Sequence, residues 1–345
     1  MAPSPIVVVP RPEIEQAVAG SEPALLEALA KGFIDFSQGK VEVAKPSHMQ
    51  FASVFNPGEA CVKTGCVRDS GRWTVKVAST FHNNAKLGLS NSQGVMLVFK
   101  EKTGELEGCL ADGGHLTDLR TSLTAVLCVR EFGPGREFGP VVGANRVLTV
   151  AIFGDGWELV EVPGVQAAVE GAQEADIVIL CTPSQQPLLA RCKRGALVIA
   201  LGADADGKRE LGPYVWWDAK AQGEGEEAVR HSFTTLADSR SQCLAFGELR
   251  YATDEKLIDE ESIWEIGDQL GMPTGHAERV RAGLERTVVI DLTGSVLDAV
   301  VRARAVAPPP IATKPTPERP ELGSGLTLGA LKHAFAPREK HKKYK

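Results

Sequence analysis

The stretch that decides the fold is GCLADGGHLTDLRT, residues 108–121. It reads as the apolar end of a strand followed by a Gly-Gly turn. Thr117 and Asp118 are typical helix-capping residues, so we predict a helix that begins at Leu119 and carries Arg120 in its first turn. A cation near the N-terminus of a helix is unfavourable, because that end of the helix dipole is positive. The arrangement is favourable when the helix N-terminus and the guanidinium together bind an anion. The sequence thus indicates an anion site at Arg120, with an ordinary surface arginine as the alternative.

A second candidate cation, Lys76, lies in residues 73–78, where side chains alternate as in a strand. Thr74 and Lys76 fall on one face of this strand, and Val75 and Val77 fall on the other. A lysine in such a strand usually belongs to a solvated face. The strand alone therefore predicts a solvent-facing lysine.

The pattern of elements changes at residues 108–121, and this change predicts two domains. Before it, a helical period broken at Gly20 is followed by strands between turn residues, at 41–43, 59–67, 74–79 and 94–99. After it, short wholly apolar runs alternate with helices, at 177–181, 196–201, 214–217 and 287–292. We predict an antiparallel β-rich domain followed by a parallel sheet with helices on both faces.

Two of the apolar runs end in residues suited to a ligand site. Ligands of parallel α/β sheets bind at the carboxyl ends of the strands. Thr182 follows one predicted strand and Gly202 another, so we expect both at the crevice, where Gly202 would let the backbone approach a ligand closely. Asp204 lies at the same strand end, although a structural turn is an alternative role for it, because Asp206-Gly207 is a turn signal.

The composition excludes several classes of protein. An apolar share of 43 % and a charged share of 24 % over 345 residues are typical of a globular protein with a core. The net charge of −6 argues against a general nucleic-acid binder. The seven cysteines show no CxxC pair, which indicates buried thiols in a reducing compartment, and the seven histidines show no metal-ligand spacing. The histidine spacing therefore predicts no metal site. The apolar run at 6–9 is too short to cross a membrane, so we expect a cytoplasmic protein.

A series of motifs resembles the ornithine cyclodeaminase/μ-crystallin family, in the order in which that family has them. The resemblance covers residues 6–306 and extends through the opening stretch. Its other parts are DFSQGK (35–40), VKVASTFHNNAKLGLSNSQGVMLVF (75–99), ANR (144–146), AVEGAQEADIVILCTPSQQPLL (168–189), ALVIALGADADGKREL (196–211), ADSRSQCLAFGEL (237–249) and VVIDLTGSVLDAVVRA (288–303).

The resemblance implies an α/β fold, in which a Rossmann-like parallel sheet domain accompanies an α+β substrate and dimerisation domain. It also implies a nicotinamide cofactor, NAD or NADP, a small amino or imino acid as substrate, and a homodimer. By the same resemblance, Lys76 and Arg120 match the lysine and arginine that bind the substrate carboxylate, and Asp204 matches a catalytic acid/base.

The domain boundaries follow from the same alignment. We expect residues 1–121 in the substrate and dimerisation domain, 122–286 in the Rossmann-like domain, and 287–306 in a return to the first domain. Residues 307–345 are rich in proline and end in a run of lysines. They read as an extended linker and a solvated basic tail, with a targeting or docking role as the alternative.

One departure from the family concerns the substrate. Ornithine cyclodeaminase proper has a glutamate in the strand before the lysine strand, where this chain has Lys63. A cation there would repel the side-chain ammonium of a diamino acid and favour an additional anionic group. The sequence thus favours a small imino or amino acid over ornithine, and ornithine cyclodeaminase is retained as an alternative activity.

A second departure concerns the dinucleotide site. Only residues 122–144 separate Arg120-Thr121 from Asn145-Arg146, too few for a helix and the βαβ unit that carries the family's GxGxQA loop. The preferred alignment therefore predicts a sheet that lacks its first βα unit. In the other alignment, residues 147–153 are that first strand, residues 154–156 are a remnant of the loop, and the next helix and second strand are lost.

The remaining cofactor residues are predicted from the preferred alignment. Asn145 and Arg146 lie where the second strand would end, so the guanidinium could bind an adenosine 2′-phosphate and NADP is preferred over NAD. Thr182 and Gly202 complete the predicted cofactor-binding set. Three hypotheses stay open: an active NAD(P)-dependent oxidoreductase, a non-catalytic ligand-binding protein, and a defective chain that lacks the glycine loop and folds badly.

Overall fold

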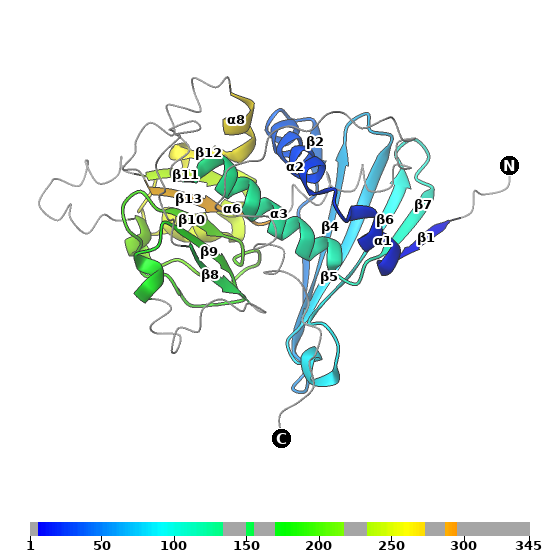
Figure 1. The fold of residues 1–345 in the computed structure, drawn as a ribbon, viewed down its shortest axis with the longest axis horizontal. Helices are drawn as coiled ribbons and strands as arrows, with labels where there is room; N and C mark the ends of the chain where they lie inside the picture. Colours follow the sequence, from blue (N-terminus) through cyan, green and yellow to red (C-terminus); the bar gives the residue numbers. More distant parts are fainter. Residues whose placement is uncertain (1–5, 134–149, 155–169, 217–232, 273–286, 295–345) are drawn as a thin grey trace, which may run out of the picture.

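The alternating strands of the first third of the chain form one seven-stranded sheet (Figure 1). The computed structural model describes residues 6–133, 150–154, 170–216, 233–272 and 287–294. The sheet has the order β1-β7-β6-β5-β4-β2, and β3 also pairs with β4. Its strands are β1 (Val7–Pro10), β2 (Val41–Val43), β3 (Ser47–Phe51), β4 (Gly58–Val67), β5 (Arg72–Phe81), β6 (Ser92–Lys100) and β7 (Leu106–Ala111).

This sheet confirms the predicted antiparallel domain, with one exception at its edge. All described pairings are antiparallel apart from β1, which runs parallel to β7. Strands β1 and β3 were not expected, because neither the four residues of β1 nor the sequence SHMQF of β3 alternates clearly between polar and apolar side chains. The two predicted helices are α1 (Arg11–Val18) and α2 (Glu22–Ser37), separated at Gly20, whose φ is +74°.

The helix after the Gly-Gly turn starts earlier than predicted. Helix α3 (His115–Phe132) begins directly after Gly114, whose φ of +92° lets the chain turn straight into the helix. The carboxylate of Asp112 accepts a hydrogen bond from the Leu116 N–H at 2.9 Å and so satisfies the helix start. Arg120 therefore lies in the second turn, and the prediction that placed it in the first turn was wrong.

The apolar runs of the second half form a six-stranded sheet in which every described pairing is parallel, as predicted. Its order is β12-β11-β13-β10-β9-β8. The strands are β8 (Val150–Gly154), β9 (Ile177–Cys181), β10 (Leu197–Ala200), β11 (Phe233–Ala237), β12 (Ile263–Glu265) and β13 (Thr287–Asp291). The short helices α6 (Arg240–Phe246), α7 (Glu248–Asp254) and α8 (Ile266–Gly271) belong to the same half.

Successive residues of the central strands enter two different cores, which accounts for their being apolar throughout. In β9, Ile177 and Ile179 pack in the core that α2 and α3 cover. The intervening Val178 and Leu180 pack in the core on the other face, together with Leu249 of α7. The fold therefore matches the predicted α/β class, a Rossmann-like parallel sheet beside an α+β domain.

Two boundaries of the predicted domains need correction. Strand β13 lies between β10 and β11, so residues 287–291 belong to the parallel sheet and not to a return to the first domain. The division at 121/122 falls inside α3, which runs unbroken from one half to the other (Figure 1). The rest of the expected return, up to residue 306, and the tail lie outside the described residues.

One expected strand is a helical turn. Residues 214–217 were predicted as a strand, but Pro213–Trp216 form a short 3₁₀ helix. Proline at the first position has no N–H for a sheet hydrogen bond and suits the start of a helical turn. The apolar side chains that suggested a strand, Val215 and Trp216, pack into the outer core instead.

The position of β8 bears on the shortened dinucleotide unit. In a doubly wound sheet of order 3-2-1-4-5-6, the first strand lies beside the fourth. Strand β8 lies directly beside β9, with Val150 opposite Ile177, and therefore holds the place of a first strand. This topology favours the alignment that made residues 147–153 the first strand. In the described residues no strand lies beyond β8, so the described sheet is shortened at this edge.

A close helix contact joins the two halves and can be tested by substitution. A Cβ atom on Gly267 of α8 would lie 1.9 Å from the carbonyl oxygen of Phe33 in α2. We expect Gly267→Ala to lower the free energy of unfolding by about 1–3 kcal/mol, because the helices must move apart. Urea unfolding would measure this loss.

The matched control is Gly271→Ala in the same helix, where a Cβ atom would make only an ordinary 3.5 Å contact with Ile34. We expect this variant to be as stable as the wild type or slightly more stable, because alanine favours helix. Equal stability of the two variants would contradict the close packing of α2 against α8.

Candidate active site

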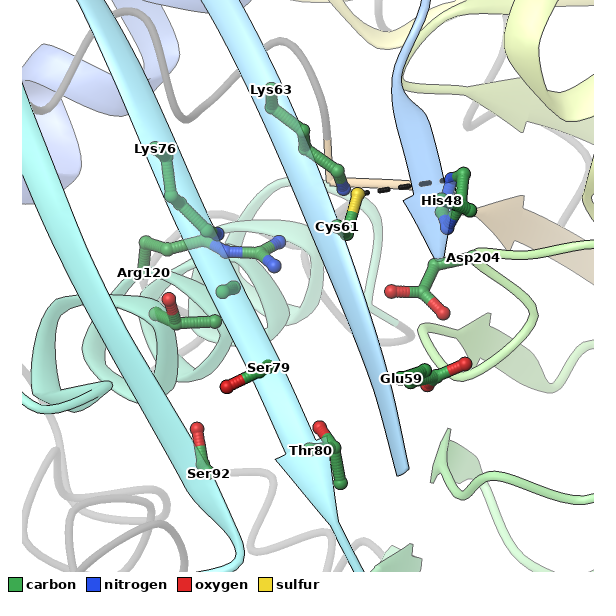
Figure 2. Close-up of a pocket in the computed structure, with 12 residues that line it drawn as sticks. His48, Glu59, Cys61, Lys63, Lys76, Ser79, Thr80, Ser92, Arg120 and Asp204 are labelled. Atoms are coloured by element: carbon green, nitrogen blue, oxygen red, sulfur yellow. Dashed lines mark hydrogen bonds between the residues drawn. The ribbon is translucent and has the colours of Figure 1, made fainter. Parts of the chain in front are cut away.

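A cavity of about 80 Å³ opens between the first sheet and the loop that follows β10 (Figure 2). The three residues for which a substrate role was predicted, Lys76, Arg120 and Asp204, all line it. They come from β5, α3 and the loop after β10, so the fold brings together residues that are far apart in the sequence. The remaining lining residues are His48, Glu59, Cys61, Lys63, Ala78, Ser79, Thr80, Ser92 and Thr117.

Two lysines on neighbouring strands form the floor of this cavity. Lys63 of β4 pairs directly with Lys76 of β5 in the antiparallel register, so both side chains project from the same face of the sheet. They are only 3 % and 2 % exposed. The prediction that Lys76 lies on a solvated face was therefore wrong: this polar face is covered by the other half of the molecule, and the lysines lie in its interior.

Arg120 is held against the turn that follows β13. It is 9 % exposed, and a Cβ atom on Gly294 would lie 2.2 Å from one of its terminal nitrogens. Gly294 also has a φ of +76°, a conformation that glycine adopts without strain. Any other residue at position 294 would displace the guanidinium, so the glycine shapes the cation side of the site.

Asp238 fixes this turn by a set of hydrogen bonds. Its carboxylate accepts from the N–H and hydroxyl of Thr293, at 3.1 and 3.0 Å, and from the N–H of Gly294 at 2.6 Å. The carbonyl oxygen of Thr293 in turn accepts a hydrogen bond from the Lys63 ammonium at 2.8 Å. One buried carboxylate in the parallel sheet domain thus positions the backbone that contacts both Lys63 and Arg120.

Asp204 lies on the opposite side of the cavity from Arg120 in the view of Figure 2. Its carboxylate accepts from Lys208 at 2.8 Å, and the same ammonium donates to Glu59 at 2.7 Å. Burial raises the pKa of Asp204, but the positive charges of Lys208, Lys63 and Arg120 outweigh burial and leave the pKa below its ordinary value. The Asp204 side chain is 34 % exposed, so an ionised carboxylate faces the cavity.

His48 of β3 completes this side of the cavity. Its Nε2 lies 3.7 Å from the sulfur of Cys61. Burial lowers the pKa of His48, and the positive charge of Lys63 lowers it further, although Asp204 acts in the opposite direction. The imidazole is therefore neutral at pH 7 and can donate or accept a hydrogen bond there.

Thr182 and Gly202, predicted to contact a cofactor, both hydrogen-bond the same glutamate. One oxygen of the Glu210 carboxylate accepts from both the N–H and the hydroxyl of Thr182, each at 2.7 Å, and the other accepts from the N–H of Gly202 at 2.9 Å. The close approach at Gly202 is to Thr182, whose carbonyl oxygen would lie 2.1 Å from an added Cβ. Glu210 thus ties together the ends of β9 and β10, at the start of the loop that carries Asp204.

The sequence predictions missed several lining residues. Glu59 and His48 lie on strands whose pattern gives no sign that these side chains border a cavity. A signal for Lys208 was present, because it lies four residues after Asp204 in the segment GADADGK. Asn145 and Arg146, predicted to bind the cofactor, lie outside the described residues.

Comparisons with known proteins agree with this fold. A model of the ornithine cyclodeaminase/mu-crystallin family matches residues 145–307. An uncharacterized cyclodeaminase of Sinorhizobium fredii is 26 % identical over 270 residues, which are 69 % of this chain and 76 % of that protein. The iminosuccinate reductase of Paracoccus denitrificans is 25 % identical over 266 residues, which are 67 % of this chain and 75 % of that protein.

Solved structures share the fold. The crystal structure of the Paracoccus denitrificans iminosuccinate reductase in complex with NAD⁺ superposes with a TM-score of 0.62 at 22 % identity, over 87 % of this chain and 95 % of the other. An archaeal alanine dehydrogenase dimer with bound NAD gives a TM-score of 0.65 at 17 % identity, over 87 % and 94 % of the two chains. Within the described ranges, no helix is both long and apolar enough to cross a membrane.

The contact between Lys208 and Asp204 leads to a test of the charge balance. We expect Lys208→Met to raise the pKa of Asp204, because it removes the cation that most strongly offsets the effect of burial. A carbon-13 NMR titration of the side-chain carboxylates would measure the change, with the Asp204 signal assigned by its loss in Asp204→Asn. Lys208→Arg keeps the cation and is the control. An Asp204 signal that titrates at the same pH in the wild type and both Lys208 variants would contradict this arrangement.

Proposed function

We propose that this chain belongs to the ornithine cyclodeaminase/mu-crystallin family, whose model matches residues 145–307, and that it is an NAD(P)-dependent oxidoreductase. It reduces a small imino acid or oxidises the corresponding amino acid. The observation that carries the proposal is the cavity, where Lys76 and Arg120 face Asp204. Two cations suit a substrate carboxylate, and a carboxylate suits the substrate nitrogen. The NAD⁺ complex of the iminosuccinate reductase supports the same chemistry.

The geometry of the parallel sheet fits a dinucleotide beside this cavity. Asp204 lines the cavity and comes from the loop directly after β10, so the carboxyl end of the sheet faces the substrate site. Dinucleotides of doubly wound sheets bind outside that end. A nicotinamide held there would donate a hydride to the substrate or accept one from it. The assignment of Asn145 and Arg146 to the adenosine end, with NADP preferred because a guanidinium suits a 2′-phosphate, belongs to the alignment in which they follow the second strand, whereas the position of β8 favours the other alignment.

The described residues would orient and polarise an imino acid. The Lys76 ammonium and the Arg120 guanidinium bind its α-carboxylate and fix the direction in which the C=N bond points. The ionised Asp204 accepts a hydrogen bond from the protonated imine nitrogen and stabilises its positive charge, which makes the imine carbon a better hydride acceptor. The electron pair of the C=N bond moves to the nitrogen as hydride arrives, and the nitrogen keeps its proton.

The same site disfavours ornithine. The ammonium of Lys63 lines the cavity beside Lys76, where a diamino acid would place a second positive charge close to a buried lysine. Ornithine cyclodeaminase activity is therefore the weaker of the two catalytic alternatives. A non-catalytic ligand-binding protein is the third, and a cofactor titration separates it from the first two.

The experiment that tests the function follows the fluorescence of NADH and NADPH. We expect the protein to bind at least one of them and to consume it when an imino acid is supplied. Cyclic pyrroline and piperideine 2-carboxylates, and 2-oxo acids mixed with ammonia, cover the cyclic and open-chain classes. Absence of dinucleotide binding at millimolar concentration, or of turnover with every imine, would overturn the proposal.

The carboxylate clamp predicts the effect of one substitution. We expect Arg120→Ala to lower kcat/KM for an imino acid by roughly 100-fold, because loss of one partner of a buried charge pair typically costs about 2–5 kcal/mol. Dinucleotide affinity should be nearly unchanged, since Arg120 lines the substrate cavity. Steady-state kinetics and a dinucleotide titration measure the two effects. Wild-type activity in Arg120→Ala would show that this arginine does not bind the substrate.

We also propose a homodimer formed through the first sheet. Strand β3 is exposed along its whole length, and large apolar side chains on it and after it are open to solvent, Met49 at 60 %, Phe51 at 37 % and Phe55 at 70 %. An exposed apolar edge strand suits an interface. We expect light scattering to give twice the chain mass at micromolar concentration, and Met49→Glu with Phe55→Glu to give the monomer mass. A wild-type monomer would contradict this proposal.

A further inference from the structure

We propose that the substrate is a short imino dicarboxylate whose second carboxylate is bound by Lys63. This inference rests on the proposed function and names the substrate class for the same cavity. A 2-oxo diacid and an ammonium ion lose water to give the protonated imine, and NAD(P)H would give a hydride to the imine carbon. The electron pair of the C=N bond goes to nitrogen, and NAD(P)⁺ and the amino diacid are formed.

The spacing of Lys63 and Lys76 suits two carboxylates of one small molecule. Directly paired residues of an antiparallel ladder have Cβ atoms about 4.5–5.5 Å apart. Both lysines line the same cavity, together with Arg120. Lys76 and Arg120 bind one carboxylate in the proposed function. Lys63 then lies one strand further along, toward Asp204 and His48 in Figure 2, where the other end of a short diacid would reach.

The positive charge that lines this cavity favours a ligand with more than one negative charge. Like charges directly opposite each other on neighbouring strands destabilise a sheet, and the cost rises when both are taken out of water. Lys63 and Lys76 are 3 % and 2 % exposed. Three cations line the cavity, Lys63, Lys76 and Arg120, and the two lining carboxylates, Asp204 and Glu59, both accept a hydrogen bond from a fourth cation, Lys208. The arrangement therefore matches a diacid better than a monocarboxylate.

The hydrogen bonding of Lys63 is compatible with its binding a carboxylate of the substrate. Its ammonium donates to the neutral carbonyl oxygen of Thr293 at 2.8 Å. A lysine ammonium has three N–H donors, so this hydrogen bond holds the group in place and leaves other donors for a carboxylate. Because Asp238 fixes the Thr293 turn, the ammonium is positioned before the ligand arrives.

Lys63 also acts electrostatically on groups near it, which is an alternative role for this lysine. Its charge is among those that lower the pKa of Asp204. A lysine whose only role is to keep Asp204 ionised would serve every imino acid equally. A lysine that binds a second carboxylate serves diacids only, so the two roles differ in their effect on substrate preference.

The first experiment uses binding alone. Calorimetry would compare succinate with butyrate, which has a similar chain but a single carboxylate, on the wild-type protein. We expect succinate to bind at least about 10-fold more tightly, because a buried cation gains a charge-assisted partner. In Lys63→Gln this difference should vanish. Lys45→Gln, which removes an exposed lysine just before β3, is the matched control and should keep it.

The second experiment uses turnover. Oxaloacetate and pyruvate, each with ammonia, yield imines that differ by one carboxylate. We expect a kcat/KM preference of roughly 100-fold for the diacid, and we expect Lys63→Gln to remove this preference by lowering kcat/KM for the diacid, mainly through KM, much more than for pyruvate. Equal losses for both substrates in Lys63→Gln would assign Lys63 to Asp204 and overturn the proposal, as would a wild-type preference for pyruvate.

The two experiments separate this inference from the proposed function. If the wild type reduces neither imine but binds succinate through Lys63, the proposed reaction fails and the diacid site stands. If it reduces imines but binds succinate and butyrate equally, the reaction stands and the diacid site fails. Should Lys63→Gln fold poorly in thermal unfolding, Lys63→Met is the substitute, and the wild-type comparison of succinate with butyrate remains decisive.

Discussion

The burial of positive charge beneath the second domain is the constraint on which the rest of the site depends. Lys63 and Lys76 are paired across two strands and covered by the parallel sheet domain, so their charges cannot be solvated by bulk water. Hydrogen-bond acceptors and a negative charge in the surrounding structure offset these charges. The Thr293 carbonyl receives Lys63, and the Asp204 carboxylate adds a negative charge across the cavity. The polar groups of the site thus offset the charge of the two buried lysines.

The positions of these acceptors are set by hydrogen bonds some distance from the cavity. Glu210 ties Thr182 to Gly202 and so fixes the loop from which Asp204 projects. Asp238 does the same for the turn beside Arg120. In each case a buried carboxylate binds backbone N–H groups at the end of a parallel strand, which stiffens the loop that follows. The precision of the cavity thus originates in the parallel sheet, although most of its cations come from the other half.

The sequence predicted the fold class and the three central site residues, but by different routes. Periodicity was sufficient for the parallel sheet, because short strands that are apolar throughout are typical of a sheet covered on both faces. Periodicity alone described Lys76 as solvated, and only the family resemblance gave it and Arg120 a substrate role. The failure for Lys76 has its origin in tertiary contact, because segments distant in the sequence decide whether the polar face of a strand is covered.

Helix α3 enters both halves of the molecule, with consequences for how substrates of different size are distinguished. Leu116 at its start packs with Ile14 and Met96 of the first domain, whereas Leu127 near its end packs beneath the parallel sheet. A single rigid rod anchored at both ends opposes hinge bending between the halves. We therefore expect the distance between Lys76 and Asp204 to stay nearly the same whichever ligand is bound. We also expect the site to distinguish ligands by their length, because the two halves cannot move apart to admit a longer one.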